Sequence, residues 1–144
     1  MLDKEQIENW EEEREVQLEM DFEGMRGDER DKTPMQMVQE YVRVSKQKPD
    51  RSMSERLIFE ESDEWMEELN GSDGAAELKE LSDLVYVIYG YANVRGWDLD
   101  MAVLRVHDNN MGRMNQPDGT IQWRDDGKVL KNKAYPKVDL GDLI

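Results

Sequence analysis

The sequence predicts an all-α protein, and three observations favour this fold class. Apolar residues recur at the three-to-four-residue spacing of helices across most of the chain. Residues that can cap a helix precede these segments, and Gly or Pro residues follow them. Strand-like alternation is confined to residues 121–130. We therefore expect a four-helix bundle followed by a short C-terminal hairpin or an extended tail.

We expect two parts in the 144 residues, because the composition changes near residue 32. Residues 1–30 carry 12 acidic and 4 basic side chains with weak amphipathicity, and Gly24 and Gly27 lie in a linker-like stretch. Residues 1–32 are therefore interpreted as an acidic N-terminal extension, and residues 33–144 as the helical domain.

The first two helices have recognisable start and stop signals. Thr33 is placed to cap a helix whose first residue is Pro34, and Pro49 ends that helix. Ser and Glu at residues 52 and 55 have the spacing of a capping box, which predicts the start of the second helix at residue 52. The Asn-Gly pair at residues 70–71 ends the second helix.

The third and fourth helices also begin at capping residues. Ser72 or Asp73 caps the third helix, which runs toward Gly96. Asp98 caps the fourth helix, which we expect to fray near Pro117. The third helix carries an apolar stripe at helical spacing, formed by Leu81, Leu84, Val85 and Ile88.

The composition excludes several functional classes. The 34 acidic residues outnumber the 19 basic ones, and the net charge of −15 disfavours binding to nucleic acid or an anionic membrane. The absence of Cys and the single His exclude disulfides, a thiolate nucleophile and a His-rich metal site. No apolar run approaches the roughly 20 residues that span a bilayer, so we expect a cytoplasmic protein.

Two acidic motifs lie on the second and third predicted helices. Glu61 and Glu64 share one helix face, as do Glu80 and Asp83, because residues three apart lie one turn from each other. The break at residues 70–71 makes the two helices antiparallel neighbours, so the two pairs face each other. A hard divalent cation such as Mg²⁺ or Mn²⁺ relieves their repulsion. The alternative interpretation is that the acidic runs solvate helix faces.

These residues also carry a family resemblance. Glu60-Glu61-x-x-Glu64, followed by Glu80-x-x-Asp83 within ELSDLVYVIYG, resembles the signature of the MazG-like all-α nucleoside triphosphate pyrophosphohydrolases. The resemblance continues through residues 98–111 and 126–135, where it is similar to the phosphoribosyl-ATP pyrophosphohydrolase-like branch that phages and bacteria encode. It covers about residues 34–140.

The resemblance implies an intertwined homodimer of helical bundles, or a dimer of dimers, in which water attacks the α-phosphate of a nucleoside triphosphate. Glu61, Glu64, Glu80 and Asp83 would ligate Mg²⁺, for which Mn²⁺ can substitute. Glu64 would also orient or deprotonate the attacking water, with Glu60 in support. The host cytoplasm is the expected location if a phage encodes the chain. The residues expected to bind the triphosphate are Asn110, Arg113, Lys131, Lys133 and Tyr135.

The substrate and the functional class leave alternatives open. The branch includes an enzyme that prefers (d)GTP, so hydrolysis of dGTP or GTP to the monophosphate and pyrophosphate is the first expectation. Phosphoribosyl-ATP or another deoxynucleoside triphosphate is the alternative substrate. A non-catalytic acidic helical dimer would bind no Mg²⁺, and an acidic mimic of DNA would bind its partner independently of Glu61.

Overall fold

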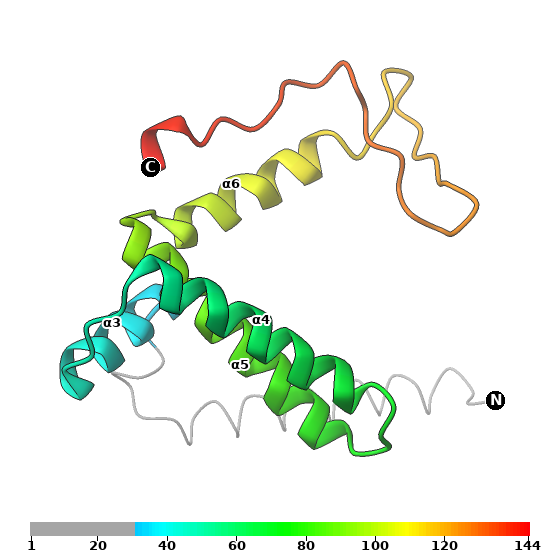
Figure 1. Cartoon of the computed structure of the whole chain (residues 1–144). Coiled ribbons are helices and arrows are strands. Elements are labelled where there is room, and N and C mark those ends of the chain that lie inside the picture. Colours follow the sequence, from blue (N-terminus) through cyan, green and yellow to red (C-terminus); the bar gives the residue numbers. More distant parts are fainter. Residues whose placement is uncertain (1–30) are drawn as a thin grey trace. The chain divides into compact units, whose positions relative to one another are not determined.

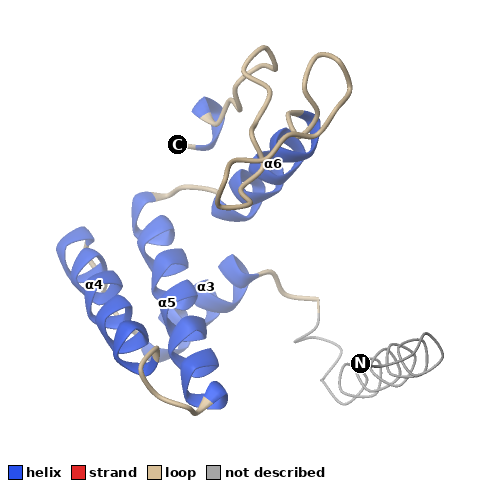
Figure 2. Cartoon of the chain, turned by 90° about the vertical axis from the view of Figure 1, so that its right-hand side faces the viewer, coloured by secondary structure: helices blue, strands red, loops and turns tan. Residues whose placement is uncertain are grey.

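The structure is a computed structural model that describes residues 31–144, and within this range all regular secondary structure is helical (Figures 1 and 2). The expectation of an all-α fold is therefore confirmed for the described residues. The acidic extension expected over residues 1–32 lies outside them except for its last two residues. The four α-helices are α3 (Pro34–Ser45), α4 (Arg51–Glu68), α5 (Gly74–Arg95) and α6 (Leu99–Gly112).

Helix α3 begins at Pro34, as the sequence predicts, but it ends at Ser45, well before Pro49. Lys46 follows with a φ of 54°, a left-handed conformation that terminates helices. The residues up to Pro49 form the connection to α4 rather than part of the helix.

The predicted N-cap of α4 is wrong by two residues. Asp50 is the N-cap, and its carboxylate accepts a hydrogen bond of 2.7 Å from the backbone N–H of Met53. This carboxylate satisfies one of the free N–H groups of the first turn, and Ser52 lies inside the helix. Glu55 does not complete a capping box; it forms a 2.8 Å ion pair with Arg51 one turn earlier.

The caps of α5 and α6 agree with the sequence. Asp73 accepts hydrogen bonds from the backbone N–H groups of Ala75 and Ala76, and Gly96 ends α5 with a φ of 70°. Asp98 accepts from the backbone N–H of Met101 and thereby starts α6. Helix α6 ends at Gly112, somewhat before the predicted fraying point.

The helices α4 and α5 form an antiparallel hairpin, which the short turn between Glu68 and Gly74 enforces (Figure 1). Helix α3 packs against α5 near the end of the hairpin remote from that turn. The buried apolar core lies at this junction and consists of Met35, Val38, Tyr89 and Ala92. This small core orients the hairpin, whose other half carries the acidic motifs.

The C-terminal segment is less regular than predicted. The expected hairpin over residues 121–130 is reduced to one antiparallel bridge between Trp123 and Val129. The end of the chain is not fully extended, because residues Gly141–Leu143 form a 3-10 turn, η1. Arg105 of α6 pairs with Asp142, and the backbone N–H of Asp98 donates to the carbonyl of Leu143, so η1 docks on α6.

Many large apolar side chains remain exposed in the described part of the chain. Phe59 on α4 is 70% exposed, Leu78 on α5 is 64% exposed and Val103 on α6 is 51% exposed. No large side chain in this range is fully buried. The chain therefore presents apolar helix faces that its described residues do not cover. None of the described helices combines the length and apolarity needed to cross a membrane.

Candidate metal centre

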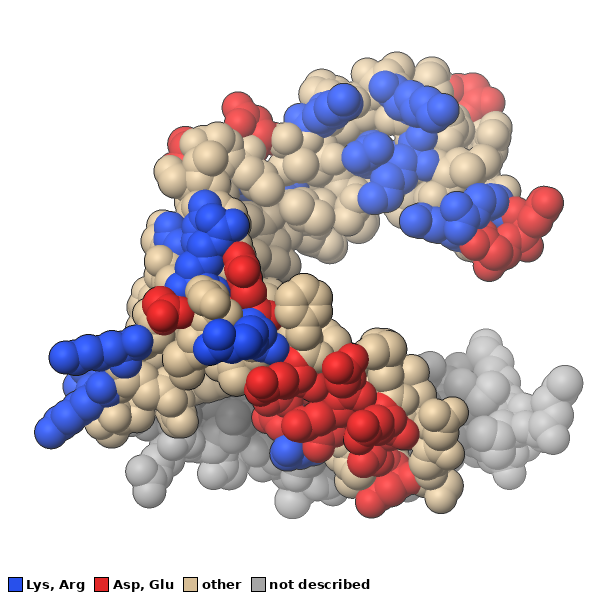
Figure 3. All heavy atoms as spheres, viewed as in Figure 1, with Lys and Arg blue, Asp and Glu red and all other residues tan. Residues whose placement is uncertain are grey.

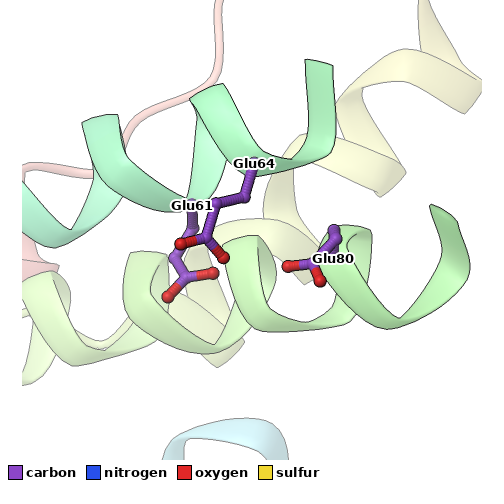
Figure 4. A group of neighbouring side chains, drawn as sticks. All are labelled: Glu61, Glu64 and Glu80. Atoms are coloured by element: carbon purple, nitrogen blue, oxygen red, sulfur yellow. The ribbon is translucent and has the colours of Figure 1, made fainter. Parts of the chain in front are cut away.

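Three carboxylates converge in the middle of the α4–α5 hairpin. Glu61 and Glu64 lie one turn apart on α4 and project toward α5, where Glu80 lies opposite them (Figure 4). One oxygen from each of the three side chains lies within 4.8 Å of the other two. The structure thus brings together three of the four carboxylates that the sequence predicts to face each other.

Two oxygens of the glutamate trio lack a hydrogen-bond partner among the described residues. They are Oε2 of Glu61 and Oε2 of Glu80, and both are buried. Burial raises the pKa of Glu61, and the charges of Glu64 and Asp83 raise it further. The pKa of Glu64 is also raised, first by desolvation and then by the adjacent Glu80. A buried carboxylate oxygen is costly unless a hydrogen-bond donor or a cation satisfies it.

A lysine lies beside the glutamate trio. The Nζ atom of Lys79 lies 3.2 Å from Oε1 of Glu80 and 2.7 Å from Oδ2 of Asp83. The pKa of Lys79 is raised by its hydrogen bonds to these two carboxylates, so the ammonium stays charged. Lys79 thus neutralises part of the acidic charge, but it does not reach the two orphaned oxygens.

Asp83 and Glu60 lie outside the glutamate trio. Asp83, expected as a fourth ligand, is paired with Lys79 one turn before it on α5. Its side chain is 40% exposed, compared with 15% for Glu80. Glu60 is exposed on α4. The ligand role of Asp83 and the supporting role of Glu60 stay predictions.

The residues expected to bind phosphates gather around the C-terminal end of α6. Arg113 is the C-cap of α6, and Asn110 in its last turn accepts a 2.8 Å hydrogen bond from Nζ of Lys131. Arg113, Lys131 and Lys133 line one cavity of about 660 Å³. Tyr135 packs directly against Gly112, where a methyl group would lie 2.2 Å from the phenol oxygen.

Two features of these sites were missed by reasoning from the sequence. Lys79 could have been found, because it precedes Asp83 by four residues, the spacing of a helical ion pair. Arg124 also lines the basic cavity. It comes from the irregular segment, for which the sequence offers no periodicity that would place its side chain.

A helical hairpin that brings three glutamates together defines an all-α protein with a candidate oxygen-ligand metal centre. The family model of phosphoribosyl-ATP pyrophosphohydrolase matches residues 21–110, which is more than half of the chain. The chain therefore belongs to the phosphoribosyl-ATP pyrophosphohydrolase family, and the glutamate trio is consistent with the metal site typical of that family. No curated protein matches the sequence.

Proposed function

We propose that this protein is a Mg²⁺-dependent nucleoside triphosphate pyrophosphohydrolase. The observation that carries the proposal is the convergence of Glu61, Glu64 and Glu80, with two buried and unpartnered oxygens, in a chain of a pyrophosphohydrolase family. An acidic helix face that served only for solubility would expose these oxygens to water rather than bury them without partners.

The chemistry of the glutamate trio fits a hard divalent cation. Carboxylate oxygens are preferred ligands of Mg²⁺ and Mn²⁺, and the two orphaned oxygens of Glu61 and Glu80 lack any other partner in the described structure. Asp83 is the proposed fourth ligand, and it becomes available once its carboxylate leaves Lys79. When bound, Mg²⁺ supplies positive charge that neutralises phosphate oxygens and eases the loss of a proton from water.

The proposed reaction is attack of a water oxygen on the α-phosphorus. A bond forms between this oxygen and the α-phosphorus, the bond to the bridging oxygen of the β-phosphate breaks, and pyrophosphate leaves. Glu64 is exposed and has a raised pKa, so it is proposed to orient the water and to accept its proton. Glu60, its neighbour on α4, is proposed to support it. The residues proposed to hold the phosphates are Asn110, Arg113, Lys131, Lys133 and Tyr135.

The proposed substrate is a (d)NTP, with dGTP or GTP first. This choice rests on the resemblance of residues 34–140 to the phage-type branch. Phosphoribosyl-ATP is the second candidate, and the description of the matching family favours it.

We also propose that the active form is a homodimer or a dimer of dimers. The apolar stripe of the third predicted helix, α5, is substantially exposed, with Leu81 at 41%, Val85 at 45% and Ile88 at 37%. Contiguous apolar faces of this kind are usually covered in soluble proteins. Light scattering after size exclusion is expected to give at least twice the 17.0 kDa mass of the chain; a monomeric mass would reject the proposal.

A panel of nucleoside triphosphates and phosphoribosyl-ATP, incubated with Mg²⁺ or Mn²⁺, tests the function. We expect a monophosphate and pyrophosphate in equal amounts, with the largest rate for dGTP or GTP, and no turnover with chelator. Release of orthophosphate would reject the α-phosphate mechanism. Failure to hydrolyse any substrate or to bind Mg²⁺ would favour the non-catalytic helical dimer, and capture of a DNA-binding partner independently of Glu61 would favour the DNA mimic.

A further inference from the structure

Trp65 on α4 carries a buried polar group that has no partner. The Nε1–H group of its indole is buried, and no described residue accepts a hydrogen bond from it. A buried tryptophan N–H normally finds an acceptor, because without one the donor has lost its hydrogen bond to water in exchange for nothing. The indole therefore has an unused donor inside the half of the hairpin that carries the glutamate trio.

Trp65 lies on the same face of α4 as Glu61. The less exposed positions of α4 recur at helical spacing through Ser54, Ile58, Glu61 and Trp65, and this face packs against α5. Residues four apart on a helix have Cβ atoms about 6 Å from each other. Helical side chains also lean toward the N-terminus of their helix, so the indole extends over the turn that carries Glu61. The carboxylate of Glu61 is thus within reach of the indole N–H.

Glu61 offers the matching acceptor. Acidic side chains gather over the α4–α5 hairpin (Figure 3), and an exposed one such as Glu60 accepts hydrogen bonds from water. Oε2 of Glu61 is buried without a donor. The other buried oxygen of this kind belongs to Glu80, whose carboxylate already accepts a hydrogen bond of 3.2 Å from Lys79. The unused donor of Trp65 and the unused acceptor of Glu61 therefore form the natural pair.

We propose that Trp65 is a positioning residue of the metal centre. Its indole N–H donates to Oε2 of Glu61 when this glutamate binds the cation through its other oxygen, because carboxylates that ligate metals are themselves held by hydrogen bonds. The hydrogen bond keeps the ligating oxygen of Glu61 turned toward Glu64 and Glu80, and it satisfies two buried groups at once. This inference rests on the proposed binding of Mg²⁺ by the glutamate trio.

The ¹H–¹⁵N resonance of the Trp65 indole tests the inference directly in the wild-type chain. It is assigned as the one of four indole resonances that Trp10→Phe, Trp97→Phe and Trp123→Phe all retain. On addition of Mg²⁺, we expect the indole proton of Trp65 to move downfield, because a new hydrogen bond to a carboxylate deshields it. The indole proton of Trp123, which is 61% exposed, is expected to stay in place. A Trp65 resonance that does not move downfield at Mg²⁺ saturation would overturn the inference.

A matched pair of variants measures the effect on metal binding. Trp65→Phe keeps an aromatic ring but removes the donor, so we expect the affinity for Mn²⁺ measured by calorimetry to fall at least about tenfold. Trp123→Phe makes the same change in the irregular C-terminal segment and is expected to stay within about twofold of the wild type. Equal affinities of the two variants would overturn the inference. The titration of the wild-type chain decides the question even if Trp65→Phe does not fold.

The same measurements separate this inference from the proposed function. Binding of Mg²⁺ without a downfield shift of the Trp65 resonance would reject the role of Trp65 alone. Binding with the shift, but without hydrolysis of any nucleotide, would reject the proposed function alone. A wild-type chain that binds neither Mg²⁺ nor Mn²⁺ would reject both.

Discussion

The Nζ atom of Lys79 lies 2.7 Å from Oδ2 of Asp83, on the helix that also carries Glu80. The ammonium group thus forms an ion pair with the carboxylate that is proposed as the fourth ligand of the metal. A divalent cation at the glutamate trio has to compete with this internal cation for Asp83 and Glu80.

Replacement of Lys79 tests this competition. Lys79→Gln removes a charge that neutralises Glu80 and Asp83, so we expect a lower Tm in EDTA. We also expect a larger rise in Tm on addition of Mn²⁺, because the competing cation is gone. Thermal unfolding with and without Mn²⁺ measures both effects, with Lys46→Gln as the control. A smaller rise with Mn²⁺ in Lys79→Gln would show that Lys79 assists rather than opposes metal binding.

Neutralisation of one proposed ligand is expected to raise the Tm of the metal-free protein and to lower its activity. Glu61→Gln removes one of three charges whose oxygens lie within 4.8 Å of one another, so its Tm in EDTA rises above that of the wild type. The same change removes a ligand, so the rise in Tm with Mn²⁺ is lost and activity falls at least about 100-fold. Glu67→Gln makes the same chemical change on an exposed position of α4, outside the trio. Equal behaviour of the two variants would argue that Glu61 only solvates the helix.

The contact between Gly112 and Tyr135 predicts a steric effect on the phosphate-binding segment. A methyl group on Gly112 would lie 2.2 Å from the phenol oxygen and 2.3 Å from Cζ, so Gly112→Ala must displace the ring. We expect a loss of about 1–3 kcal/mol in the free energy of unfolding and a higher KM for the nucleotide. Denaturant unfolding and steady-state kinetics measure the two effects.

Gly90 provides the matched control for this substitution. It lies within α5, and apart from its chain neighbours and the nearby backbone of α5 itself, no atom of the described residues lies within 4 Å of a methyl group placed there. Gly90→Ala is therefore expected to gain about 0.5–1 kcal/mol from the lower entropy of the unfolded chain. If Gly112→Ala were as stable and as active as Gly90→Ala, Tyr135 would not be fixed against α6.

Docking of the C-terminal turn on α6 is expected to depend on pH. The hydrogen bond from Arg105 holds the pKa of Asp142 below its ordinary value of 3.8. Because the folded-state pKa is lowered, the pair stabilises docking above pH 3.8 and loses this effect as the pH falls through the folded-state pKa. Hydrogen exchange at the Asp98 amide, which donates to Leu143, reports the docking. In Asp142→Asn, we expect the Asp98 amide to be weakly protected even near neutral pH. Protection equal to that of the wild type in this variant would contradict the prediction.

The positions of helices could be predicted because their ends are set by local chemistry. Asp73 and Asp98 carry short carboxylates that cap the first turns of α5 and α6, and Gly96 adopts the left-handed conformation that ends α5. The start of α4 was predicted wrongly because Asp50 and Ser52 are both good caps, and the choice between them depends on backbone geometry. Sequence reading has no means to rank two caps that lie two residues apart.

Only the part of the candidate site that follows from helical spacing could be predicted from the sequence. Spacing placed Glu61 and Glu64 on one face, and the short turn brought Glu80 opposite them. Spacing also grouped Asp83 with Glu80, but the choice of an ammonium partner depends on side-chain conformation. The basic cavity depends on hydrogen bonds in an irregular segment, so Lys128 could not be placed from the sequence.

Hydrolysis of dGTP in ¹⁸O-labelled water with Mg²⁺, followed by mass spectrometry of both products, tests the central claim most directly. The account predicts one ¹⁸O atom in the monophosphate and none in the pyrophosphate, with no product from Glu61→Gln or from the wild type in EDTA. Label in the pyrophosphate, release of orthophosphate, or undiminished turnover by Glu61→Gln would contradict it.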